Sequence, residues 1–317
     1  MTTDTWYDYF VDTLYERYPK KTQLAQALMD LLCIEREAAY RRLRKEVLFP
    51  ANEIMRIASE WNISLDAIVG IASEQVSFKV QLSNYLDPPP EQIEYIHNII
   101  KICNVPDMRY MEVSNKLPRS LTVGFPYLSR CQLLKWMYQF VLEEKRILPF
   151  SKVFFPHKVA ILVSDYYKAT KNVANTTYVW DCDIFGFLIR DIRYFHSIYL
   201  ITNEEKEFIK KDLYALLDYM SEVAIKGCWL ETGNKVDLYI ADISIDTNYN
   251  YYYSDEFKIC RVHAFAKSEI YTQDPDMIEN FVAWMQLKKR ASVKISEADE
   301  KARIEFFMKQ RQLIDTL

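Results

Sequence analysis

The chain has 317 residues, half of them hydrophobic and 15% aromatic, a composition that indicates a packed globular protein and argues against disorder. Its formal net charge is −4, which argues against a protein that coats nucleic acid without sequence specificity, because such proteins are basic. Any contact with DNA is therefore confined to a local surface. The length is sufficient for two domains with substantial cores.

Residues 1–72 are predicted to form one helical domain. Their apolar residues recur three and four positions apart, which predicts helices over 6–18, 22–32, 36–45 and 51–61. The short break Cys33-Ile34-Glu35 forces the helices on either side of it to pack together, as in a helix-turn-helix. The run Pro88-Pro89-Pro90 is the plainest break in the chain, so residues 73–90 are expected to be a linker.

Residues 91–317 are predicted to form an α+β domain for dimerisation or sensing. Helical periodicity and end signals such as Thr202, Gly227 and Asp274 predict helices over 91–103, 127–144, 159–170, 184–195, 204–226, 275–289 and 296–312. A strand is predicted over 177–182. A second strand is predicted over 109–113, although these residues could instead begin a loop. Alternation predicts an antiparallel meander over 235–243, 249–253 and 257–265. The expected fold is therefore α+β and mainly helical, with a small antiparallel sheet.

The side chains of this meander are expected to alternate between two faces. One face, with Val236, Leu238 and Ile240, is expected to be covered, and the other, with Asp237, Tyr239 and Ala241, more polar. Tyr249, Tyr251 and Tyr253 should share a face, with Tyr252 on the opposite one. Core packing is the favoured interpretation of these tyrosines, and an aromatic binding surface is the alternative.

The segment from Leu28 to Gly70 resembles the helix-turn-helix domain of the Cro and lambda-repressor (Xre-like) class. The class pattern Leu-Ala-x-x-Leu-Gly-Ile-Ser corresponds to Leu28-Met29-Asp30-Leu31-Leu32-Cys33-Ile34-Glu35; Met29, Cys33 and Glu35 replace the usual Ala, turn Gly and Ser or Thr cap. The closing helix and its tail correspond to Ile54, Ile57, Ala58, Trp61, Ile63, Ser64-Leu65-Asp66 and Ile68. The run Ala39-Tyr40-Arg41-Arg42-Leu43-Arg44, followed by Phe49, is similar to uncharacterised transcriptional regulators of Bacteroidetes that carry a C-terminal α+β region. The resemblance implies a repressor-like protein that binds double-stranded DNA, usually as a homodimer.

The helix predicted over 36–45 is the candidate recognition helix. Tyr40 and Leu43 are expected to face the core, and the candidate DNA-binding residues are Arg36, Glu37, Arg41, Arg42, Arg44 and Lys45. Arginine forks suit guanine edges and phosphates alike, so the pattern does not assign a base to any one of them. The alternative is a solvated charged face on an interaction protein whose degenerate helix-turn-helix no longer binds DNA. Glu35, Glu37 and Glu46 favour that alternative.

Enzyme and metal motifs are not apparent in the sequence. The five glycines form neither G-x-G-x-x-G nor a phosphate-binding loop, and the four histidines are isolated from one another. The carboxylates Asp181 and Asp183, and likewise Asp242 and Asp246, are better explained by turns and caps than by catalysis. No catalytic residue, cofactor or metal is therefore predicted, and the chain is not expected to be an enzyme. The identity of any small-molecule effector is left open.

The remaining expectations concern location and assembly. The six cysteines show no C-x-x-C spacing, and the sequence begins without a signal-peptide pattern, so a reducing cytoplasm and no membrane partner are expected. A homodimer contact is predicted on the apolar helix face of Ile278, Phe281, Val282 and Met285. Packing of that face within its own subunit is an equally weighted alternative.

Overall fold

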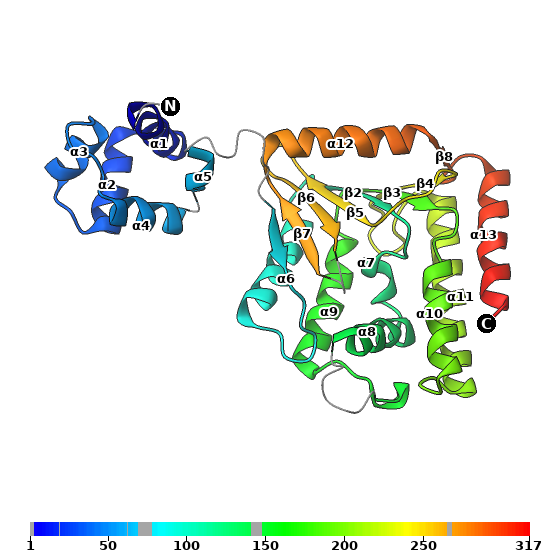
Figure 1. The fold of residues 1–317 in the computed structure, drawn as a ribbon. Coiled ribbons are helices and arrows are strands. Elements are labelled where there is room, and N and C mark those ends of the chain that lie inside the picture. Colours follow the sequence, from blue (N-terminus) through cyan, green and yellow to red (C-terminus); the bar gives the residue numbers. More distant parts are fainter. Residues whose placement is uncertain (1–2, 19, 62, 69–77, 141–147, 265–267) are drawn as a thin grey trace. The chain divides into compact units, whose positions relative to one another are not determined.

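The computed structural model describes residues 3–18, 20–61, 63–68, 78–140, 148–264 and 268–317. The chain divides into two compact units, Met1–Ser77 and Phe78–Leu317 (Figure 1). Each unit has its own hydrophobic core. The described helices include none that is both long enough and apolar enough to cross a bilayer.

All the regular secondary structure described in the first unit is helical. It contains α1 (Thr3–Arg17), α2 (Lys21–Leu32), α3 (Arg36–Leu43), α4 (Ala51–Trp61) and α5 (Leu65–Ile68). Phe10, Leu14, Leu28 and Ile57 are fully buried in its core. The third helix ends at Leu43 and not at residue 45 as predicted, because Lys45 adopts a positive φ of 63°, which is incompatible with a continuing right-handed helix.

The turn between α2 and α3 contains a left-handed residue that is not glycine. Cys33 has φ 55° and ψ 44° and ends α2, at the position where the resembled class carries Gly. A side chain in this conformation clashes with its own backbone, and glycine avoids that cost. We expect Cys33→Gly to raise the free energy of unfolding by about 0.5–1 kcal/mol.

Urea denaturation of the full-length chain, followed by a signal from the first unit, measures this gain. Cys33→Ala is the matched control, because it removes the thiol but keeps the Cβ atom that causes the strain. Equal stabilisation by Gly and Ala would contradict the backbone explanation.

The second unit is built on an eight-stranded mixed sheet with the order β1-β7-β6-β5-β2-β3-β4-β8. The strands are β1 (Lys79–Gln81), β2 (Arg109–Ser114), β3 (Asn175–Asp181), β4 (Lys235–Ala241), β5 (Tyr249–Tyr253), β6 (Lys258–His263), β7 (Glu269–Thr272) and β8 (Ser292–Lys294). The central strands β2, β3 and β4 are parallel. The other neighbouring pairs are antiparallel.

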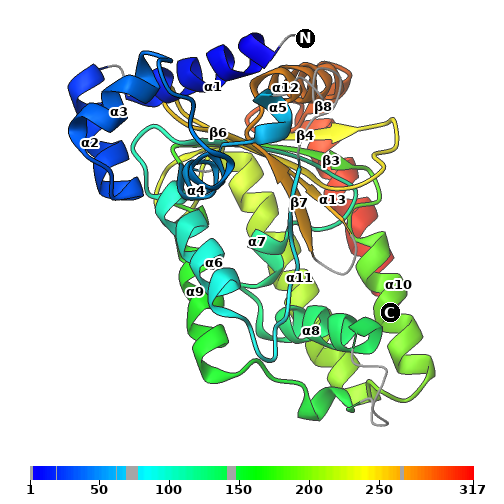
Figure 2. The same cartoon turned by 60° about the vertical axis from the view of Figure 1, so that its left-hand side comes forward.

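Helices cover both faces of this sheet. They are α6 (Pro90–Cys103), α7 (Arg119–Thr122), α8 (Pro126–Phe140), the short 3-10 helix η1 (Phe150–Lys152), α9 (His157–Thr170), α10 (Gly186–Ser197), α11 (Asn203–Lys226), α12 (Pro275–Arg290) and α13 (Glu300–Asp315). The sheet separates α12 from α6–α11 (Figures 1 and 2). The larger core lies on the α6–α11 side and includes residues of α13, whereas a smaller core lies under α12.

The α+β class is confirmed, but the expected small antiparallel sheet is wrong. The strands predicted over 235–243, 249–253 and 257–265 correspond to β4, β5 and β6, although 265 itself lies outside the described residues. β4 does not pair with β5, because β2 and β3 lie between them. The prediction assumed that consecutive strands pair, whereas parallel neighbours are joined by long helical crossovers that leave no local signal.

Alternation along the strands is confirmed, but the expected polar face is not. Val236, Leu238 and Ile240 of β4 join the larger core, and Ala241 on the opposite face joins the smaller one. Both faces are covered because β4 is an inner strand of the parallel region. The tyrosines of β5 also alternate: Tyr252 packs in the larger core and Tyr251 in the smaller one.

The predicted dimer face of α12 is occupied within the chain. Ile278, Phe281 and Met285 are buried and pack in the smaller core, with Val282 partly buried beside them. This is the alternative that the sequence left open, packing within the subunit. A second copy could reach these side chains only if α12 separated from its own sheet.

The segment predicted as a linker contains a strand. Residues 79–81 form β1, which pairs antiparallel with β7, and the second unit begins at Phe78. Pro88-Pro89-Pro90 lies inside the second unit and leads into α6, whose first residue is Pro90. Residues 73–77 lie outside the described part of the chain.

Candidate functional sites

The exposed face of α3 is the first candidate site. Ala39 and Leu43 are buried and fix the orientation of the helix, so Arg36, Glu37 and Arg41 are exposed. Two of these three side chains are cationic, and the buried side chains of Ala39 and Leu43 hold the helix that carries them.

Tyr40 is half-buried beside this face. The Arg36 guanidinium lies 5.7 Å from the centroid of the Tyr40 ring, and the Lys21 ammonium 6.0 Å from it. Both separations suit a cation–π contact. Tyr40 therefore helps to place two cations near the start of α3.

Arg42, one of the predicted DNA contacts, is instead an internal residue of the fold. Its guanidinium donates to both carboxylate oxygens of Glu53 at 2.6 and 2.8 Å and to the Ala38 carbonyl at 3.2 Å. Its side chain is 15% exposed and packs near the Phe49 ring. A forked, half-buried pair of this kind is among the stronger polar contacts in proteins. Arg42 therefore ties α3 to α4 and is not available to a partner.

Three other predicted contacts, Arg41, Arg44 and Lys45, form exposed ion pairs within the first unit. Arg44 contacts Glu37 and Glu46 at 2.7 Å each, Arg41 lies 3.7 Å from Glu46, and Lys45 pairs with Asp8. Hydrogen bonding to Arg44 lowers the pKa of Glu46 below its usual value. Exposed ion pairs of this kind contribute little to the free energy of unfolding and are screened by salt. Their side chains therefore exchange readily for other partners. Arg41, Arg44 and Lys45 are thus partly neutralised but still accessible.

The sequence predicted all of these bases on one helix, which holds for Arg36, Arg41 and Arg42 but not for Arg44 and Lys45, which follow its last residue. The acidic partners were not predicted. Glu53 lies on α4, so its contact with Arg42 depends on how two helices pack. The partnership of Lys45 with Asp8 likewise spans 37 positions along the chain. The pairs of Arg44 with Glu37 and Glu46, and of Arg41 with Glu46, join residues at most seven positions apart, so the sequence alone could have suggested them.

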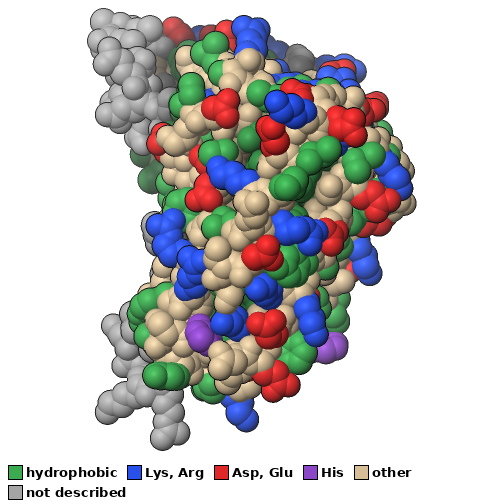
Figure 3. Space-filling view, turned by 90° about the vertical axis from the view of Figure 1, so that its right-hand side faces the viewer, with side chains coloured by type: hydrophobic (Ala, Val, Ile, Leu, Met, Phe, Trp, Pro, Cys, Tyr) green, Lys and Arg blue, Asp and Glu red, His purple; other side chains and the backbone are tan. Residues whose placement is uncertain are grey.

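The second unit shows a mixed surface on the face seen in Figure 3. Acidic, basic and apolar side chains are interspersed there, without a single-sign patch. Such interspersed charge is typical of a solvated surface. On that face, the charge distribution gives no positive stripe for a nucleic-acid backbone.

A buried polar cluster joins β6, β7 and α6 in the second unit. Glu269 accepts hydrogen bonds from Arg261 at 3.0 Å and from the Tyr95 hydroxyl at 2.7 Å, and His263 lies 3.4 Å away. Burial alone would raise the pKa of Glu269, but Arg261, with help from His263 and Tyr95, lowers it well below the usual value. The cluster therefore holds an ionised carboxylate inside the protein. The four side chains are scattered through the sequence, which is why no motif revealed them.

The Asp181 carboxylate at the end of β3 serves local structure. Asp181 accepts backbone N–H bonds from Asp183 at 3.0 Å and from Ile245 at 3.1 Å. The turn interpretation of this residue is confirmed. Among the described residues, no three His, Cys, Asp or Glu side chains come together in a way that could hold a metal ion.

Lys171 is a buried lysine without a counter-ion in the described structure. Its ammonium group lies 3.4 Å from the centroid of the Trp229 ring and makes no hydrogen bond to the described residues. Burial lowers its pKa to about 7, against a small opposing effect of Glu231. The aromatic ring favours the charged form and partly offsets the cost of burial.

Replacing Lys171 with Met should therefore stabilise the protein in a pH-dependent way. Below pH 10.5 the unfolded lysine is protonated, while the folded one loses its proton above about 7, so its penalty is largest at pH 7 and below and fades as pH rises. We expect a gain of about 1–3 kcal/mol at pH 7 that shrinks towards pH 10. Denaturant unfolding at pH 7, 8.5 and 10 measures it, with exposed Lys158→Met as the control. A gain independent of pH would contradict the ionisation argument.

Comparison of the chain with protein-family models, with curated proteins and with solved structures gave no match.

Proposed function

We propose that the chain is a DNA-binding transcriptional regulator whose first unit contacts double-stranded DNA through the exposed face of α3. The observation that carries the proposal is the presentation of Arg36 and Arg41 on a short helix that is fixed from below by Ala39 and Leu43. A single α-helix fits the major groove, where arginine forks pair with guanine edges or with flanking phosphates.

The connection from α2 to α3 supports this geometry. Only Cys33-Ile34-Glu35 separates the two helices, and the left-handed conformation of Cys33 lets the chain turn sharply there. In a helix-turn-helix the second helix enters the groove while the first crosses the backbone. Within this proposal, Arg36 and Arg41 make the principal contacts, and Arg41 gives up its contact with Glu46 to do so. Arg44 and Lys45 likewise exchange their acidic partners for phosphates, and Arg42 keeps α3 on α4.

A second candidate, an interaction module that does not bind DNA, is favoured by one observation. Acidic side chains of the same unit already form ion pairs with four of the candidate bases, Arg41, Arg42, Arg44 and Lys45. Glu37 also lies on the exposed face of α3, where it would repel a phosphate backbone. A module of this kind would use the mixed charges of α3 to contact a protein partner.

Gel shifts with the full-length chain and genomic fragments of its source organism separate the two candidates. We expect retarded complexes at about 50 mM salt that weaken steeply towards about 200 mM, because each phosphate contact releases counter-ions. A folded chain that retards no fragment at either salt concentration would overturn the DNA proposal and favour the interaction module.

A further inference from the structure

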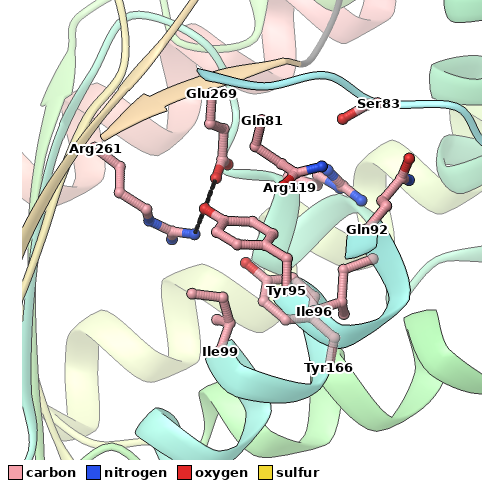
Figure 4. A pocket seen from close by; sticks show the side chains of 10 residues that line it. All are labelled: Gln81, Ser83, Gln92, Tyr95, Ile96, Ile99, Arg119, Tyr166, Arg261 and Glu269. Atoms are coloured by element: carbon pink, nitrogen blue, oxygen red, sulfur yellow. Dashed lines mark hydrogen bonds and ion pairs between the residues drawn. The ribbon is translucent and has the colours of Figure 1, made fainter. Parts of the chain in front are cut away.

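A small cavity of the second unit lies between α6, α9 and the strands β6 and β7 (Figure 4). Its volume is about 40 Å³, more than the roughly 10–15 Å³ that one water needs. Tyr95, Ile96 and Ile99 of α6 and Tyr166 of α9 form an aromatic and aliphatic part of its wall. Arg119 of α7 also faces it, beside the end occupied by Arg261 and Glu269.

The two arginines of this cavity have different surroundings. Arg261 is ion-paired with Glu269, whereas Arg119 has neither an ion pair nor a hydrogen bond to the residues that the structure describes. The Arg119 guanidinium rests on the Tyr85 ring, 4.9 Å from its centroid. The cavity therefore contains one positive charge more than its own carboxylate balances.

Arg119 also lines a second cavity of about 190 Å³ on its other side. Lys116, Lys135 and His263 line that cavity, together with one carboxylate, Asp191, which pairs with Lys135. The surroundings of Arg119 are thus cationic on this side too. No carboxylate from the described residues on either side of Arg119 is left to pair with it.

Arg119 is partly buried, so its guanidinium loses part of its hydration, and no carboxylate of the described residues compensates for that loss. An anion with two oxygens in one plane matches the guanidinium fork. The wall formed by Ile96, Ile99 and the rings of Tyr95 and Tyr166 offers an apolar contact for the rest of such a molecule. These features together favour an organic acid over an inorganic ion.

We propose that this cavity binds a small organic carboxylate, with the Arg119 guanidinium holding both carboxylate oxygens and the apolar wall contacting a short hydrocarbon body. Arg261 and Glu269 form the fixed polar end of the site. This site belongs to the second unit alone, and its existence does not depend on DNA binding by the first.

Calorimetric titration and thermal unfolding of the full-length chain test the proposal with propionate and butyrate as probes, at constant ionic strength. We expect saturable binding and a rising Tm with either acid, and no effect of propionamide, which has the same shape without the charge. Inorganic phosphate is titrated in the same way, to compare an inorganic anion with the two carboxylates. Binding of phosphate as tight as that of the carboxylates, or no saturable binding of either acid, would overturn the assignment.

Variants of Arg119 supply an independent readout. In the absence of any ligand, Arg119→Met should leave Tm unchanged or raise it, because an uncompensated charge is removed, and it should weaken carboxylate binding at least tenfold. Arg119→Lys keeps the charge but not the fork and should also bind more weakly. Exposed Arg290→Met is the matched control and should bind like the wild type. A large fall in Tm of Arg119→Met, or normal binding by both Arg119 variants, would overturn the proposal.

Discussion

Under the proposed function, a chain in which Arg36 and Arg41 are both replaced by Ala should bind DNA at least about 30-fold more weakly than the wild type. Each lost base or phosphate contact costs about 1–3 kcal/mol, and every 1.4 kcal/mol is a factor of ten in affinity. Both side chains are exposed and neither is in the core. The double variant should therefore unfold at the same denaturant concentration as the wild type.

The measurement is fluorescence anisotropy with the fragment that the wild type retards most strongly, at a series of salt concentrations. If the two arginines contact phosphates, the slope of log affinity against log salt should become shallower by about one for each. A base contact lowers affinity for that fragment more than affinity for unrelated DNA.

The matched control removes two exposed arginines of the second unit, Arg190 and Arg290. This variant changes the net charge by the same amount, so it separates a local contact from a general electrostatic effect. Equal weakening by the two double variants would contradict the assignment of α3 as the contact surface. Arg42→Ala should behave differently. It should lower the free energy of unfolding, and it should weaken DNA binding only indirectly, because α3 is no longer held in place on α4.

Replacing Glu269 with Ala should lower the free energy of unfolding by about 3–5 kcal/mol at pH 7. The variant leaves the Arg261 guanidinium, which is 3% exposed, as a buried charge without its partner, and such losses are among the largest that single substitutions cause. Tyr95 loses its hydrogen-bond acceptor at the same time. Urea unfolding of the full-length chain measures the change.

The effect should depend on pH in a defined direction. Because the pKa of Glu269 is lowered in the folded state, its contribution is fully present above the ordinary carboxyl pKa and declines as pH falls below about 4.5. The stability difference between the wild type and Glu269→Ala should narrow in that range. Glu222→Ala, which removes an exposed ion pair with Lys226, should lower the free energy of unfolding far less than Glu269→Ala. Equal losses from both variants would contradict the argument from burial.

Local signals in the sequence predicted many of the helices well. Thr202 and Glu205 form a reciprocal capping box at the start of α11, and Gly227 ends that helix in the left-handed conformation, as the residue types indicated. The Asp274 side chain caps the start of α12 by accepting a hydrogen bond from the backbone N–H of Met277. These features involve contacts within four residues, so a single sequence contains them.

Contacts between distant segments were not accessible in the same way. The central position of β2 depends on β3 and β5, which are separated from it by long stretches of chain. The short strands β1 and β8 have only three residues each, too few for a periodic pattern. The candidate cavity had no signal at all, because Arg119, Arg261 and Glu269 meet only through the fold.

The pairing of β1 with β7 determines the order in which the two units can be completed. The described core of the first unit uses residues no later than Ile68, so its contacts are local and suited to rapid folding as soon as that segment has left the ribosome. In the second unit, the first strand begins at Lys79, but Lys79 pairs with Tyr271, which lies near the end of the chain. That edge therefore stays open until most of the chain has been synthesised, and a truncation before residue 269 would expose the β6 backbone as an unpaired edge, a template for aggregation.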